Sequence, residues 1–152
     1  MKTFILTIII LFSVTFIKAQ NKDSVEVVKT TKEIFKMTQS IDWLDDNVID
    51  LGMFYKLGPY MVYRGSDKTR EWKDTCNYRN KLEQRYVDDV CYRINSTVNQ
   101  GAEPKFGNFN TKTESEGKWY TIEVKFFYKG QQRTTIFAYL KIYDRFVLGD
   151  ID

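Results

Sequence analysis

The only two cysteines of the chain, Cys76 and Cys91, are the residues whose type and spacing offer the most distinct chemistry. Fourteen residues separate them, a spacing too long for the CxxC pair of redox enzymes. An even cysteine count in a chain bound for an oxidising compartment favours one disulfide, whose chain-entropy contribution would be roughly 3 kcal/mol. The alternative is two separate thiols, with Cys91 packed as a small hydrophobic side chain on a helix.

The sequence contains no histidine, and this excludes several classes of enzyme. Ser-His-Asp and Cys-His nucleophile systems need an imidazole base, and the HExxH zinc motif needs two imidazole ligands. Two cysteines without histidine complete a zinc site only if carboxylates join them. Neither GxGxxG nor GxxxxGK[ST] occurs, so the phosphate-binding signals of nucleotide sites are missing. We therefore expect no cofactor and no metal, and the motifs assign no catalytic residue.

Four aspartates cluster in the segment IDWLDDNVID, at Asp42, Asp45, Asp46 and Asp50. A calcium loop would need acids at alternate positions, then a glycine and a closing glutamate, and this order is absent. The cluster is instead typical of a solvated helix face, on which acids near the amino end favour the helix dipole.

The first residues, MKTFILTIIILFSVTFIKAQ, have the pattern of a secretory signal peptide. Lys2 precedes an apolar run, and Ala19 supplies the small residue before a cleavage point. The apolar run is shorter than the ~20 residues that a membrane anchor needs. We predict a signal peptide over residues 1–19, and one secreted or periplasmic domain over residues 20–152 without a stable membrane anchor after cleavage.

The charge of the remaining 133 residues is close to balanced. The whole chain has 23 basic and 20 acidic residues. Two of the basic residues, Lys2 and Lys18, belong to the predicted signal peptide, so 21 basic residues face 20 acidic ones after its removal. No block of like charge stands out, and nucleic-acid binding therefore has no electrostatic support.

The elements that must position any site divide into a helical first part and a strand-rich second part. Helices are predicted over residues 23–41, from about residue 43 to a break near Gly52, and over a short segment capped by Ser66. The strongest helix signal follows Asn80, which forms a capping box with Glu83. Its apolar stripe is expected to contain Leu82, Tyr86, Val87, Val90, Cys91, Ile94 and Val98.

Four strands are predicted over residues 105–114, 118–128, 133–142 and 146–151, paired as an antiparallel meander. Helices followed by a run of strands indicate an α+β fold with the helices packed on one sheet. The third strand is apolar on both faces, as central strands covered on both sides are. Phe137 and Tyr139 share one of its faces, and Ile136, Ala138, Leu140 and Ile142 share the other.

The segments GKWYTIEVKFFYKG and TTIFAYLKIYDRFVLGDID resemble the closing strands of nuclear-transport-factor-2-like domains from bacterial secreted proteins. YRGSDKTREWKD also resembles a recurrent segment of such secreted domains. The resemblance covers residues 105–152, and covers the helical half by the order of its elements. It implies an α+β fold in which N-terminal helices lie in the mouth of a strongly curved antiparallel sheet of about four strands. The cystatin-like fold, also a helix on a curved sheet, is the alternative.

A cone of this shape has a concave mouth where a small apolar ligand can bind. The candidate ligand-binding residues are Tyr60, Tyr63, Arg64, Trp72, Tyr120 and Tyr139. The alternative for each of them is that it completes the core. We expect a secreted, non-enzymatic domain that holds a small apolar ligand or a partner protein in or on the cone.

Two other functions remain open. An apolar sheet face left uncovered by the helices would serve as a homodimer or partner surface. The resemblance also extends to ketosteroid isomerase and polyketide cyclases, which place an acid and a tyrosine inside the cone. An enzyme of that kind would use Tyr120 or Tyr139 with Glu123 or Asp150, the acids on or near the strands.

Overall fold

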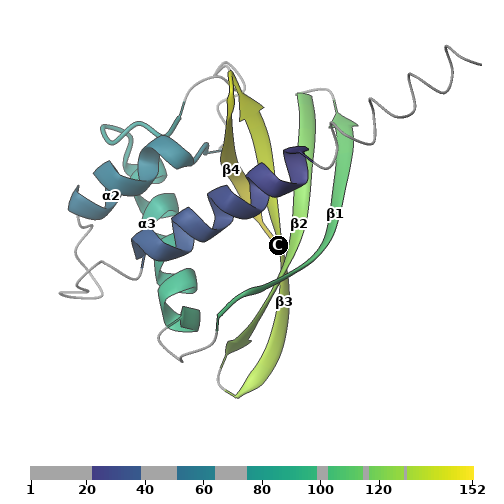
Figure 1. Cartoon of the computed structure of the whole chain (residues 1–152). Coiled ribbons are helices and arrows are strands. Elements are labelled where there is room, and N and C mark those ends of the chain that lie inside the picture. Colours follow the sequence, from purple (N-terminus) through teal and green to yellow (C-terminus); the bar gives the residue numbers. More distant parts are fainter. Residues whose placement is uncertain (1–21, 39–50, 64–74, 99–102, 115–116, 129) are drawn as a thin grey trace, which may run out of the picture.

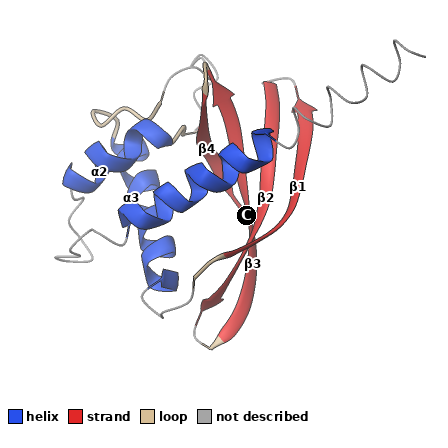
Figure 2. Cartoon of the chain, viewed as in Figure 1, coloured by secondary structure: helices blue, strands red, loops and turns tan. Residues whose placement is uncertain are grey.

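The fold is α+β, with helices gathered on one side of a four-stranded antiparallel sheet in a computed structural model (Figures 1 and 2). The structure describes residues 22–38, 51–63, 75–98, 103–114, 117–128 and 130–152. The predicted signal peptide, the aspartate cluster and the predicted short helix after Ser66 lie outside these residues, as do Arg64 and Trp72.

In the described part of the chain, three helices and one 3-10 turn precede the sheet. The first helix covers residues 22–38 and is called the N-terminal helix below. It is followed by α2 (Leu51–Leu57), the 3-10 helix η1 (Gly58–Tyr60) and α3 (Lys81–Val98). Residues 43–50 of the helix predicted to break near Gly52 lie outside the described residues, and α2 is helical from Leu51 through Gly52 to Leu57. Its inward side chains Phe54 and Leu57 are buried, and this packing outweighs the low helix propensity of one exposed glycine.

The sheet is a meander in the order β1-β2-β3-β4, as predicted. Its strands are β1 (Lys105–Glu114), β2 (Gly117–Tyr128), β3 (Gln131–Ile142) and β4 (Arg145–Ile151). The predicted strand boundaries agree with these within two residues. Alternating apolar residues and turn glycines explain the agreement, and Gly130 in the β2–β3 turn has a φ of 74°, which favours glycine.

Two β-bulges interrupt the ladders, and such bulges bend a strand. In the first, Gly107 and Asn108 of β1 lie opposite Glu123, because Phe106 pairs with Val124 and Phe109 with Ile122. In the second, Gly149 is the extra residue, since Ala138 pairs with Asp150 and Tyr139 with Leu148. The sheet is therefore curved, and its concave side receives the helices.

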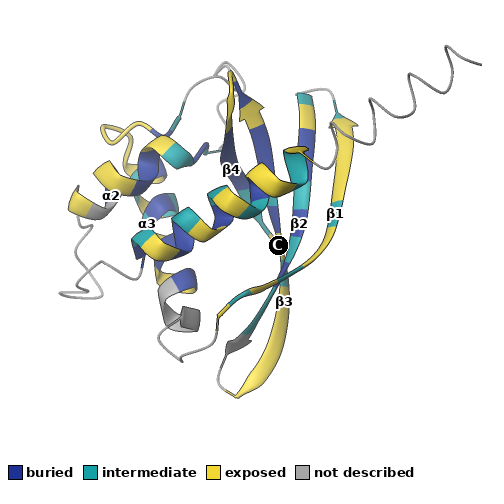
Figure 3. Cartoon of the chain, viewed as in Figure 1, coloured by how far each residue is buried: buried dark blue, intermediate teal, exposed yellow. Residues whose placement is uncertain are grey.

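The main core lies between the helices and the concave face of the sheet (Figure 3). The N-terminal helix supplies Val27, Ile34 and Phe35. The sheet supplies Phe137 and Tyr139, both almost fully buried. Near the first described residues of the N-terminal helix, the Asp23 carboxylate pairs with Lys141 of β3 at 3.1 Å.

The stripe of α3 differs from the prediction at one position. Leu82 is 53% exposed, whereas Glu83 is buried. The Glu83 carboxylate accepts hydrogen bonds from the backbone N–H of Asn77 and from the Asn80 side chain, so it holds the preceding turn against the helix start. Asn80 in turn accepts from the Leu82 N–H at 3.0 Å, which confirms it as the capping residue.

A second apolar cluster covers the convex face of the sheet. Trp119, Leu140 and Val147 are buried there together with Val62 and Ile142. The third strand is thus buried on both faces toward its end, as predicted. The apolar sheet residue left exposed on this face of β3 is Ile136, at 42%. The face on which a homodimer was expected to form is therefore largely buried within one chain.

The last residues are part of the architecture. Asp152 and Ile136 exchange two backbone hydrogen bonds of 3.0 and 3.1 Å, so pairing with β3 extends to the final residue described. Gly149 admits the Trp119 indole, because a Cβ at this position would lie 2.9 Å from the ring. The residues of β4 are consequently held in a fixed register relative to β3.

Candidate functional site

An open cavity of about 110 Å³ lies where the N-terminal helix and α3 meet the end of the sheet, and we call it the apolar pocket. Its lining residues are Phe35, Arg93, Ile94, Phe126, Thr135, Phe137, Ile151 and Asp152. Five of these eight side chains are hydrocarbon, so the pocket interrupts a core that is otherwise closely packed.

Each wall of the apolar pocket comes from a different element. Phe35 of the N-terminal helix contacts Phe137 of β3, with ring centroids 5.8 Å apart. Ile151 of β4 pairs directly with Phe137 across the ladder. Ile94 of α3 closes the helical side. The pocket thus forms at the point where three segments far apart in sequence converge.

Polar groups occur at the rim. Arg93 forms an ion pair with Asp89 one turn earlier, at 2.7 Å, and both side chains are more than half exposed. Asp152 is exposed, and Thr135 is partly buried. An exposed pair of this kind contributes little to stability. The Arg93 guanidinium can therefore move toward a polar atom of a ligand at a small cost in free energy.

Two phenols lie deeper in the core. The Tyr139 and Thr31 hydroxyl oxygens are 2.6 Å apart, while Thr31 also donates to the Val27 carbonyl at 2.7 Å. Burial raises the pKa of Tyr139 well above its ordinary value. Burial, with the nearby Cys76 and Asp150, raises the pKa of Tyr86 still further. Both phenols stay protonated at physiological pH, so neither is a base.

Four of the six predicted ligand-binding residues are described, and the structure places them in different surroundings. Tyr139 is buried in the core, and Tyr120 packs edge-on against Phe146 at 4.9 Å. Tyr63 contacts the Tyr86 ring at 5.5 Å. Tyr60 lines a separate cavity beside η1. None of these four lines the apolar pocket, and Arg64 and Trp72 lie outside the described residues.

The residues that do line the apolar pocket were not singled out from the sequence. Phe35, Phe126 and Phe137 look like ordinary core positions of amphipathic segments. The available signal was the run of aromatics at alternate positions in two consecutive strands. This run indicates a buried face but not the place where helices leave it uncovered.

The strand acids that an isomerase-like enzyme would use are engaged locally. Glu123 accepts from the N–H of Asn108 at 3.3 Å and from its side-chain amide at 3.1 Å, across the first bulge. These hydrogen bonds lower the pKa of Glu123, whereas a proton donor in an apolar cone needs a raised pKa. Asp150 accepts from the Ile151 N–H at 2.9 Å.

Cys76 and Cys91 are both buried in the main core, and the structure forms no disulfide between them. Pairing in an oxidising compartment stays a prediction, which the mass of the protein without reductant would test. Among the described residues, no group of three or more acids and cysteines is arranged to hold a metal ion. No helix in the described part of the chain is long and apolar enough to cross a membrane.

Comparisons of the chain with protein-family models, with curated proteins and with solved structures give no match.

Proposed function

We propose that this chain is a secreted or periplasmic, non-enzymatic binding domain of the nuclear-transport-factor-2-like class, and that it holds a small apolar ligand in the apolar pocket. The observation that carries the proposal is an open cavity of about 110 Å³ walled by Phe35, Phe137, Ile94 and Ile151. The secreted location rests on the signal-peptide pattern of residues 1–19.

The size of the pocket restricts the ligand. An apolar protein cavity of roughly 150 Å³ accommodates benzene or xenon. The apolar pocket is slightly smaller but opens to solvent, so a ring or a short branched chain can enter while the rest of a larger molecule stays outside. Burial of the apolar part would gain about 25 cal/mol for each Å² removed from water.

Binding is favoured over turnover by the state of the ionisable groups. Glu123 is held ionised by Asn108, and the buried phenols Tyr86 and Tyr139 are held protonated. None of these three lines the apolar pocket. The pocket therefore offers shape and apolar surface, with Arg93, Thr135 and Asp152 at its rim.

The experiment is a thermal-melting titration of the purified protein with toluene and cyclohexane as probes. A ligand that binds only the folded state stabilises it by RT ln(1 + [L]/Kd), about 1.4 kcal/mol at ten times Kd, which corresponds to a Tm increase of a few degrees. We expect Ile151→Trp to fill the pocket from its half-buried rim and abolish the increase.

The matched control is Ile136→Trp, on the neighbouring strand and the opposite face. This variant should keep the full response to both probes. The proposal fails if neither probe raises the Tm of the wild-type protein. It also fails if the Ile151→Trp variant, folded and melting cooperatively, responds as the wild type does.

A further inference from the structure

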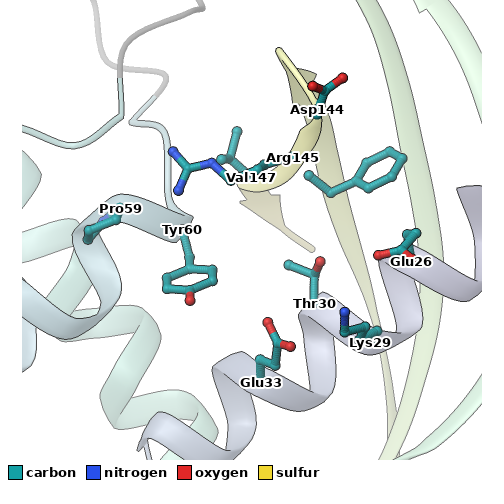
Figure 4. Close-up of a pocket in the computed structure, with 10 residues that line it drawn as sticks. Glu26, Lys29, Thr30, Glu33, Pro59, Tyr60, Asp144, Arg145 and Val147 are labelled. Carbon is teal, nitrogen blue, oxygen red and sulfur yellow. The ribbon is translucent and has the colours of Figure 1, made fainter.

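A second cavity, which we call the charged pocket, lies between the N-terminal helix, η1 and the start of β4 (Figure 4). It has a volume of about 210 Å³ and shares no lining residue with the apolar pocket. Its lining includes Phe146, whose side chain is buried on the helix side of the sheet, and Val147, whose side chain belongs to the cluster on the opposite face. It is thus a separate feature of the fold, on the other half of the same helix.

Charged side chains of both signs line this cavity. The N-terminal helix contributes Glu26, Lys29 and Glu33, and the β3–β4 turn contributes Asp144 and Arg145. None of these five side chains forms an ion pair or a hydrogen bond with another side chain in the part of the chain that the structure describes. Their hydrogen-bonding capacity is therefore open to a ligand.

The charges are distributed across the cavity. In Figure 4, Glu33 rises from the helix on one side, Arg145 lies on the opposite side, and the Tyr60 ring is between them at one end. A guanidinium offers a planar fork of N–H donors that matches a carboxylate. A carboxylate such as that of Glu33 accepts hydrogen bonds from an ammonium group. The two walls thus complement opposite charges on one small molecule.

Simple ions fit this lining poorly. A phosphate or sulfate near Arg145 would face the like charges of Glu26, Glu33 and Asp144. A metal cation would face Lys29 and Arg145, and no metal-holding group occurs among the described residues. A ligand that carries both an ammonium and a carboxylate avoids both repulsions, because each of its ends meets the opposite charge.

We propose that the charged pocket binds a small zwitterion of the α-amino-acid type, with its carboxylate on Arg145, its ammonium on Glu33 and its side chain against Phe146. An apolar floor below a charged rim selects an amino acid with a hydrocarbon side chain. Tyr60, one of the predicted binding residues, forms the end wall.

The test is isothermal titration of the purified protein with L-leucine, L-leucinamide and N-acetyl-L-leucine. The amide lacks the carboxylate and the acetyl compound lacks the ammonium, while all three keep the same side chain. We expect leucine to bind at least about tenfold more tightly than either analogue, since each analogue leaves one charged wall without a partner. Inorganic phosphate is the anion control and should not compete with leucine.

Two variants locate the site. Arg145→Gln should weaken leucine binding by about tenfold and leave the affinity for leucinamide unchanged, because leucinamide has no carboxylate. Glu33→Gln should weaken leucine binding by about tenfold and leave the affinity for N-acetyl-L-leucine unchanged, because that compound has no ammonium. The control Arg133→Gln, an exposed position on β3, and the pocket-filling Ile151→Trp should both bind leucine as the wild type does. Neither Glu33 nor Arg145 is buried, so the variants should keep the wild-type Tm.

The proposal is overturned if leucine produces no heat at millimolar concentration, or if the three compounds bind equally. It is also overturned if phosphate displaces leucine, or if leucine binding survives Arg145→Gln and is lost in Ile151→Trp. The last outcome would assign the ligand to the apolar pocket, and so distinguishes the two sites.

Discussion

The Tyr139 hydroxyl of the central strand donates a hydrogen bond to the Thr31 hydroxyl of the N-terminal helix, at 2.6 Å, and both side chains are fully buried. The direction follows from proton count. Thr31 has a single hydroxyl proton, which it donates to the Val27 carbonyl, so it can only accept from Tyr139. This bond joins the first helix to the concave face of the sheet.

Thr31→Val should be more destabilising than Tyr139→Phe. The valine leaves a buried phenol without an acceptor, which costs about 1–3 kcal/mol, whereas Tyr139→Phe leaves Thr31 bonded to Val27 and costs about 1 kcal/mol. The double variant should therefore be more stable than Thr31→Val alone. Urea unfolding of the four proteins measures this cycle, and additive losses would contradict the assigned hydrogen bond.

Glu83→Ala should lower the free energy of unfolding by about 1–3 kcal/mol. It removes the buried acceptor of the Asn77 N–H and the Asn80 amide at the start of α3. The matched control is Asp89→Ala on the same helix, whose exposed ion pair with Arg93 should contribute less than about 1 kcal/mol. Equal losses in the two variants, measured by urea unfolding, would show that Glu83 has no special role.

Gly149→Ala should destabilise the fold by about 1–3 kcal/mol, because its Cβ would lie 2.9 Å from the rigid Trp119 ring. Gly107→Ala is the comparison, since its Cβ would first meet the Glu123 carboxylate, which can move only by giving up its hydrogen bonds from Asn108. We expect a smaller loss there, because the Trp119 ring cannot move in this way. Thermal melting of both variants decides the matter, and a Gly149→Ala protein with the wild-type Tm would contradict the close packing.

The carboxyl of Glu123 should titrate below its ordinary pKa of 4.5, because Asn108 donates to it from both backbone and side chain. A group with a lowered folded pKa contributes stability above about pH 4.5 and loses that contribution as the pH falls through its folded pKa. A carboxyl-carbon NMR titration measures the shift.

In the Asn108→Ala variant the midpoint should rise but stay below 4.5, since the backbone N–H still donates. Asn110→Ala, two positions along β1, is the control and should leave the midpoint where it is. A wild-type midpoint at or above 4.5 would contradict the bulge geometry.

The sequence predicted the strands and the α3 cap well, because alternation, turn glycines and the Asn80–Glu83 pair are local signals. The sequence predicted a buried Leu82, whereas Glu83 takes the buried position. Glu83 can be buried because its carboxylate accepts the backbone N–H of Asn77. Apolar periodicity carries no information about this contact. The sequence also predicted a helix break near Gly52, and in α2 the buried packing of Phe54 and Leu57 keeps the residues that follow this glycine helical.

The site was less predictable than the fold. Phe35 and Phe137 meet at 5.8 Å although nearly the whole domain separates them in sequence. Their contact depends on the register of β3 with β4 and on the bulge at Gly149, which alternation alone does not fix. The charged pocket has the same origin, because Glu33 and Arg145 come together only once the helix lies across the sheet.

The most direct test of the binding proposal is an isoleucine δ1-methyl NMR spectrum of the protein with and without toluene. The methyls of Ile94 and Ile151 line the apolar pocket, whereas those of Ile122 and Ile142 lie elsewhere in the core. We predict saturable shifts of the first two signals and none for the second two. Unchanged Ile94 and Ile151 signals, or equal shifts at all four, would contradict a ligand site between these helices and the sheet.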